Sequence, residues 1–179
     1  MQLKLKKNCL SSAPTPPQSR AINEIKRLLS RATPDFQTAE THISRAIGGN
    51  VACIELVHNA VKRPGITEKQ KLDFLQEVVP DADRAIQRLY GDDCFEPSSN
   101  VYGHFWRLVE TRGYVRLLLD VVFASADCGE YRTSVVFSKR ILEMNHGDNN
   151  GSPPLPSPSL SPPFLMSFLQ AFVTGSRCL

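Results

Sequence analysis

Apolar side chains recur every three or four residues between about residues 20 and 142. This spacing is typical of one face of an α-helix, in which a turn takes about 3.6 residues. It predicts helices over approximately residues 20–32, 36–47, 51–62, 68–90, 102–109, 114–122 and 131–142. Alternation typical of strands is weak, so the predicted fold class is all-α. Short connections predict that successive helices lie antiparallel.

Proline and glycine mark the predicted ends of these helices. Pro34, Gly48-Gly49 and Pro64-Gly65 each follow an apolar stripe. Thr67 can cap a helix from Glu68, with Gln70 returning the bond. Pro80 interrupts a period that continues to Tyr90, so 68–90 is predicted as one kinked helix or two abutting ones.

Composition divides the chain into three predicted parts. Residues 1–19 form a basic, Pro- and Ser-rich arm that we expect to be disordered, and residues 20–151 form the helical domain. Residues 152–179 begin with six prolines in twelve residues. This shift predicts a disordered, low-complexity tail of non-homologous coding sequence that truncates the module. The apolar run 164–173 is too short to span a bilayer, so no membrane partner is predicted.

Charge is uneven although the 179-residue chain carries a net charge of only +3. Residues 1–31 contain seven lysines and arginines against Glu24 alone. This arm is interpreted as a solvated tail, or alternatively as a nucleic-acid or anionic-surface contact.

The cysteines and the N-terminal segment predict where the chain resides. Five cysteines without a CxxC pair favour free thiols in a reducing compartment. No secretory signal is apparent, so a cytoplasmic location is expected, with the nucleus as an alternative. Pro14, Pro16 and Pro17 argue against an amphipathic mitochondrial presequence.

The segment from Gly129 to His146 resembles the second half of a tetratricopeptide repeat (TPR). Its turn glycine, an aromatic residue two positions later and small residues at the helix crossing carry the likeness: Gly129, Tyr131, Ser134 and Ser138. The resemblance implies antiparallel helix pairs stacked into a right-handed, TPR-like solenoid. Val122, Ile141 and His146 depart from the pattern, where Gly, Ala and Pro are usual.

A narrower likeness covers about residues 82–151. Gly103-His104-Phe105-Trp106, Glu110-Thr111-Arg112 and Asp148-Asn149…Gly151 resemble a family of TPR-type proteins with GHFW, LETRPYMRA and LNPNDNQG segments. The resemblance implies a fold but no biochemical activity. Those relatives continue beyond the last motif, which agrees with the expected truncation. The residues assigned to the structural motif are Gly103, Trp106, Glu110, Gly129, Tyr131 and Gly151.

No residue pattern specifies a reaction. The histidines lack HxxxH or HExxH spacing, so no metal, cofactor or catalytic residue is predicted. Trp106 and Glu110 are interpreted as filling and rimming a seam between helices. The predicted function is a non-enzymatic protein–protein interaction scaffold, and an enzyme of unknown class is a third alternative. A protein or peptide partner is expected to contact Tyr102, Arg112, Arg116 and Asn149.

Overall fold

The structure, a computed structural model, describes residues 13–146, and these form an all-α fold without strands. The predicted fold class is therefore confirmed at this level. Two short 3-10 segments, η2 and η3, accompany seven α-helices: α1 (Pro16–Leu29), α2 (Phe36–Glu40), α3 (Ile43–Ile47), α4 (Ala52–His58), η2 (Asn59–Val61), α5 (Glu68–Tyr90), η3 (Val109–Thr111), α6 (Arg112–Asp127) and α7 (Tyr131–Asn145).

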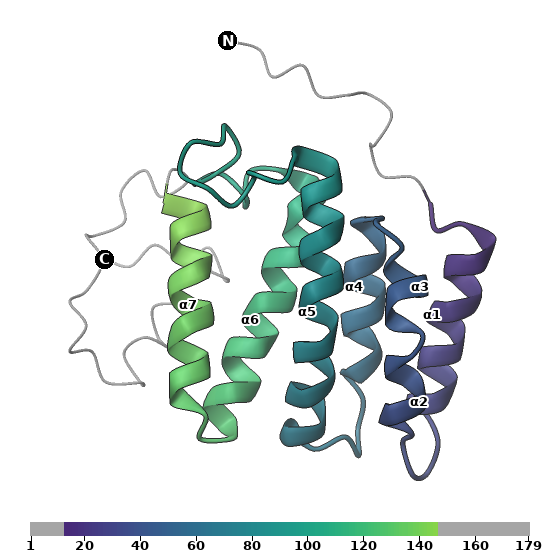
Figure 1. Ribbon diagram of the computed structural model, residues 1–179. Coiled ribbons are helices and arrows are strands. Elements are labelled where there is room, and N and C mark those ends of the chain that lie inside the picture. The colour runs from purple at the N-terminus through teal and green to yellow at the C-terminus, as the bar shows by residue number, and fades with distance from the viewer. Residues whose placement is uncertain (1–12, 147–179) are drawn as a thin grey trace.

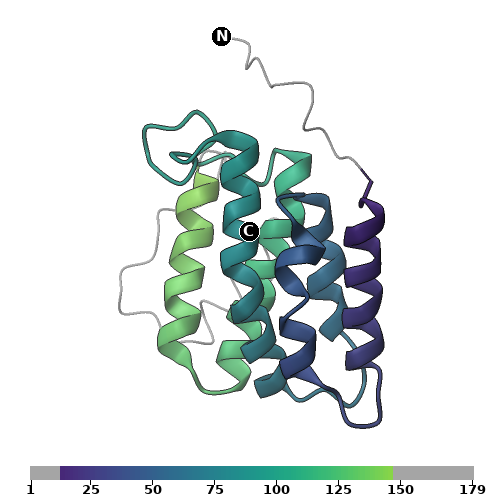
Figure 2. The same ribbon diagram turned by 45° about the vertical axis from the view of Figure 1, so that its right-hand side comes forward.

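The helices stand side by side, with α1 and α7 at opposite ends (Figures 1 and 2). Helix α6 packs against α4, α5 and α7, while α1 packs against α2, α3 and α4. Helix α5 contacts α3 on one side and α6 on the other. One apolar core therefore runs through the described part of the chain from Ile22 to Met144.

Helix α1 begins at Pro16, four residues before the predicted boundary at Arg20. Thr15 is the N-cap, and its backbone N–H donates to Gln18 Oε1 at 2.9 Å in a capping box. Proline is well suited to the first helical position, because its fixed φ matches the helix and no donor is lost there. Residues 16–19 of the expected disordered arm are thus helical. Residues 1–12 of the arm lie outside the described residues.

Two predicted helices are shorter than their apolar stripes suggest. The stripe over residues 36–47 is split at Thr41–His42 into α2 and α3, and α3 ends at Gly48 with φ of 52°. The stripe over 51–62 continues as α4 and then tightens into η2. Short helices gain most of their stability from packing, so a break costs little where the buried face continues.

Helix α5 confirms the first of the two alternatives for residues 68–90, a single helix that contains Pro80. The predicted capping box is present, since Thr67 accepts from the Gln70 backbone N–H. Pro80 lies on the exposed side of the helix. The backbone carbonyl of Gln76, which loses its intrahelical donor, is therefore on the side that water reaches.

The predicted helix over residues 102–109 is wrong. Residues 92–108 form turns and bends, and only η3 precedes α6. The Phe105 N–H donates to Met144 O at 3.0 Å, which satisfies a carbonyl in the last turn of α7. Apolar spacing misled the prediction because Phe105 lies in a loop and is nevertheless buried, with its ring centred 5.7 Å from that of Phe95 and 6.2 Å from that of Tyr114 on α6.

The α6–α7 connection has the predicted short turn. Gly129 adopts φ of 74°, and the Glu130 N–H donates to Ser125 O at 2.8 Å. Glycine accepts this left-handed conformation without the strain that a Cβ would bring. Three small residues at the buried side of this helix pair are Ser125, Ser134 and Ser138. The tail 152–179, Asn149 and Gly151 lie outside the described residues.

Candidate partner-binding surfaces

Arg112 and Arg116, which the sequence analysis predicts to contact a partner, both have partners within the chain. The Arg112 side chain donates through Nε to Trp106 O at 3.0 Å, and its guanidinium lies 5.9 Å from the Trp106 ring centroid. Arg116 donates through Nη1 to Glu55 Oε1 at 2.7 Å, linking α6 to α4. An anion at Arg116 would compete with this carboxylate, which is itself partly exposed.

Tyr102 and Gly103 lie against the end of α7. The Tyr102 ring is centred 5.4 Å from the His146 ring. Gly103 has φ of 82°, and a Cβ there would lie 2.6 Å from His146 Cε1. Both the backbone conformation and the close approach therefore require glycine at this position. The structure places Tyr102 near α7, and Asn149, another residue predicted to contact a partner, lies outside the described residues.

Trp106 and Glu110 occupy the loop and η3 before α6. The Trp106 N–H donates to the fully buried Asn145 Oδ1 at 2.6 Å, and Asn145 Nδ2 donates to Ile141 O. Glu110 borders a small pocket of about 210 Å³ that also includes Glu55 and Val109. Two acidic residues line this pocket, so it is a poor site for an anionic group.

A polar and aromatic cluster that the sequence did not reveal joins α5, the loop of residues 92–108, α6 and α7. Tyr114 is completely buried, and its hydroxyl donates to Asp83 Oδ1 at 2.6 Å. Arg140 Nη2 lies 3.0 Å from the same oxygen, and its guanidinium lies 5.0 Å from the centre of the Phe95 ring. Burial raises the pKa of Tyr114 well above its ordinary range, and Asp83 adds to this effect. The hydroxyl therefore stays protonated as a hydrogen-bond donor.

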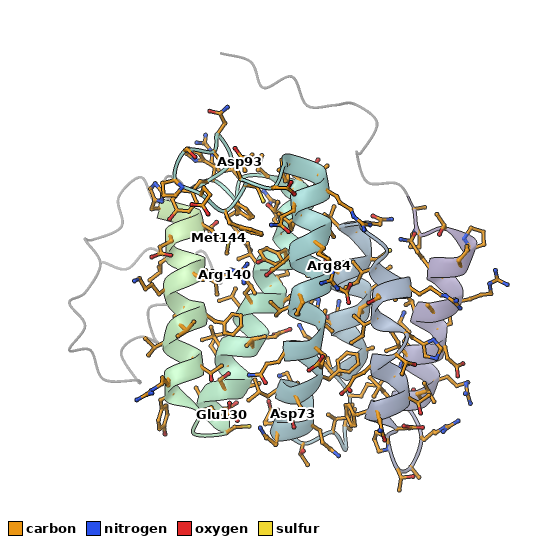
Figure 3. The ribbon with its side chains drawn as sticks, viewed as in Figure 1. Asp73, Arg84, Asp93, Glu130, Arg140 and Met144 are labelled. Atoms are coloured by element: carbon orange, nitrogen blue, oxygen red, sulfur yellow. The ribbon has the colours of Figure 1, made fainter. Side chains whose placement is uncertain are left out.

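Figure 3 shows Arg140 and Met144 one turn apart on α7, below the loop that carries Asp93. Arg140 is held between aromatic rings and a carboxylate, and Met144 is buried. These contacts hold the loop, α5 and α7 together. The cluster is therefore interpreted as structural.

A second ionisable cluster lies between α4 and α6. His58 is nearly fully buried, and its Nε2 lies 3.3 Å from Asp120 Oδ2, which is also 2.8 Å from Lys62 Nζ. Burial lowers the pKa of His58, although Asp120 opposes this effect. The desolvation cost of a buried imidazolium exceeds the attraction of a carboxylate that Lys62 already neutralises.

A groove between α1 and α3 is lined by several basic residues. It encloses about 780 Å³, and its wall consists of Pro17, Arg20, Ala21, Asn23, Glu24, Arg27, His42 and Arg45. Binding sites for drug-sized ligands usually have volumes of about 300–1,000 Å³. The groove lies at the end of the molecule opposite α7 (Figure 1).

The charged groups of this groove differ in how they are paired. Glu24 accepts two hydrogen bonds from Arg27, at 2.8 Å from Nε and 2.5 Å from Nη2. These bonds, above all, lower the pKa of Glu24, so the carboxylate is ionised near neutral pH. Among the described residues, Arg20 and Arg45 have no carboxylate partner. Three arginines thus face one glutamate.

The remaining candidate features are an exposed apolar stretch on α7 and two buried thiols. Tyr131, Val135 and Val136 on α7 each expose more than half of their surface. Cys53 and Cys94 are buried free thiols, and burial raises the pKa of each to about 11. These two thiols are therefore protonated near neutral pH and are poor nucleophiles.

Metal-binding and membrane-spanning features were sought over residues 13–146. No group of three or more His, Cys, Asp or Glu side chains in that range is arranged to hold a metal ion. Within the same range, every helix is too short or too polar to cross a bilayer.

Comparison with known proteins found no matching family model, no similar curated protein and no similar solved structure. The TPR resemblance therefore stays a prediction from the sequence. The proposals that follow depend on the packing and the side chains of this chain.

Proposed function

We propose that the chain is a non-enzymatic scaffold of TPR-like type that binds another protein or peptide. The observation that supports this most is the order of helix packing. Helix α1 packs with α2 and α3, α3 packs with α4 and α5, both α4 and α5 pack with α6, and α6 packs with α7, so successive groups of helices contact one another. In such an array every group covers the apolar face of its neighbour and leaves a long outer surface for ligands.

The α6–α7 pair supports the TPR-like interpretation in more detail. Ser134 and Ser138 are buried on α7, and Ser125 is buried on α6. Small residues let the axes of two helices come close together. Gly129 at the turn and Asn145 at the end of α7 also occupy positions that fit the motif. The right-handed course of a longer solenoid is part of this proposal.

The pairing of ionisable groups supports a binding role over a catalytic one. Tyr114 is bonded to Asp83, and Arg112 is bonded to a backbone carbonyl. The first bond connects α6 to α5, and the second connects α6 to the loop that precedes it. A catalytic group instead needs a partner in reach and access to a substrate.

Panning a random peptide library against the immobilised full chain tests this proposal. We expect one or a few related peptide families to be enriched and to compete with one another. Binding should weaken in Tyr102→Ala or Arg116→Ala if the peptide contacts the residues that the sequence predicts to bind a partner. Failure of any peptide family to enrich over an immobilised control protein would contradict the scaffold proposal.

A further inference from the structure

We infer that the groove between α1 and α3 binds an acidic peptide segment. This inference rests on the proposed scaffold function and names the site and the chemical class of the ligand. It concerns a different surface from the one that the sequence suggests around Tyr102 and Arg116.

Two arginines of the groove are available to an incoming carboxylate. Arg20 on α1 and Arg45 on α3 line the groove from two different helices, are exposed, and have no carboxylate partner among the described residues. A guanidinium can bind a carboxylate through two parallel hydrogen bonds. Two such groups facing one hollow favour an anionic ligand that lies between them.

Arg27 supplies a third positive charge along the same face of α1. It follows Arg20 by seven residues, which is about two turns, or about 10 Å along the helix axis. Its partner Glu24 is partly exposed, so a ligand carboxylate can replace it at modest cost. An extended peptide advances about 3.3 Å per residue. Acidic side chains about three residues apart would therefore match the spacing of Arg20 and Arg27.

The overall charge favours a peptide over a nucleic acid. Residues 13–146 contain 17 lysines and arginines and 17 aspartates and glutamates, so this part of the chain is neutral. Nucleic-acid affinity depends on many phosphate contacts and usually comes with a broad basic surface. Here the positive charge is local, and Pro17 and Ala21 add apolar surface suited to peptide side chains.

The test measures binding of fluorescein-labelled decaglutamate to the full chain by fluorescence anisotropy. Decaglutamate contains acidic pairs at every spacing, and decaglutamine is the uncharged control. The groove variant is Arg20→Glu with Arg45→Glu. The matched control, Arg132→Glu with Lys139→Glu, changes the net charge by the same amount on exposed residues of α7. Circular dichroism checks that both double variants fold. If the groove variant does not fold, Arg20→Gln with Arg45→Gln replaces it.

We expect decaglutamate to bind more tightly than decaglutamine. The groove variant should raise the dissociation constant at least tenfold, and the α7 variant less than twofold. Absence of decaglutamate binding, an equal loss in both variants, or no loss in the groove variant would overturn the inference. If a labelled dT20 oligonucleotide binds the natural chain more tightly than decaglutamate does, and the groove variant loses this binding, the groove is a nucleic-acid site instead.

The peptide panning separates the two proposals. If panning enriches a peptide family while decaglutamate does not bind, or binds the groove variant as well as the natural chain, the groove inference fails and the scaffold proposal stands. If no peptide family is enriched, the scaffold proposal fails.

Discussion

At the α7 end, Arg140 lies across Phe95 and Tyr114 and pairs with Asp83, whereas at the α1 end Arg20 and Arg45 are exposed and have no carboxylate partner within residues 13–146. Arginine side chains thus connect helices and a loop at the α7 end, whereas at the α1 end two of them have no carboxylate partner within residues 13–146. Near α7, an arginine is enclosed by a loop that needs polar anchors. Near α1, apolar residues and one buried hydrogen bond, from Gln18 Nε2 to Ile47 O at 2.8 Å, dock the helix on its neighbours, so the exposed arginines there are not needed as anchors.

The largest expected effect comes from the cluster at the α7 end. Tyr114→Ala removes a fully buried ring and leaves Asp83 without its hydroxyl donor, so the free energy of unfolding should fall by about 3–5 kcal/mol. Urea unfolding followed by circular dichroism measures this. Tyr114→Phe should lose only about 1–2 kcal/mol, which isolates the hydroxyl. Equal losses in the two variants would show that ring packing contributes little.

The second effect tests how the loop docks on α7. Gly103→Ala places a Cβ at φ of 82° and against His146, so it should destabilise the chain by about 2 kcal/mol. His146→Ala removes the obstructing ring. In a double-mutant cycle, the loss of unfolding free energy caused by Gly103→Ala should then be smaller, and only the part that comes from alanine at a positive φ should remain. A cost unchanged by His146→Ala would mean that the ring moves aside freely.

The third effect has the opposite sign and concerns α5, which lies between the two ends. Pro80→Ala should raise the free energy of unfolding by about 2 kcal/mol, because alanine restores a helix hydrogen bond in an exposed position. The thermal transition should remain single if both ends unfold together. A transition that divides into two would show that the α1 end and the α7 end are independently stable.

The fourth test is pH, which acts on the seam between α4 and α6. Burial lowers the pKa of His58 in the folded chain below the ordinary value of 6.5, which applies to the unfolded chain. At a pH between the folded and unfolded pKa values, the unfolded chain therefore binds more protons than the folded one. Stability should therefore be fully present above pH 6.5 and decrease as the pH falls toward the folded pKa. Urea midpoints measured from pH 8 to pH 5 test this. His58→Gln should show a flatter profile, and an identical profile would reject the assignment.

The smallest effects are expected at the α1 end. Arg20→Ala and Arg45→Ala should each change the free energy of unfolding by less than about 0.5 kcal/mol, because neither side chain has a partner to lose. Arg140→Ala should cost more, about 1–3 kcal/mol, since it leaves Asp83 partly unpaired. Equal costs at the two ends would remove the contrast between structural and available arginines.

The sequence by itself determined the helical class and most helix starts and turns. Local signals suffice for these, because the capping box of Thr67 and Gln70 and the left-handed turn at Gly129 involve residues only a few positions apart. The Thr15 and Gln18 capping box was also readable, but the nearby prolines were taken as a sign of disorder. Recognising proline as a first helical residue would have placed that start correctly.

Tertiary structure decided the conformation of residues 102–108 and the partners of the charged side chains. Phe105 and Trp106 have helix-like spacing, yet their backbone donors bind Met144 and Asn145, which lie about 40 positions later in the sequence. Whether an arginine meets a carboxylate likewise depends on which helix packs beside it. Such pairings join segments that are distant in sequence, so a local pattern cannot specify them, and the groove at α1 exists only once α3 has packed against it.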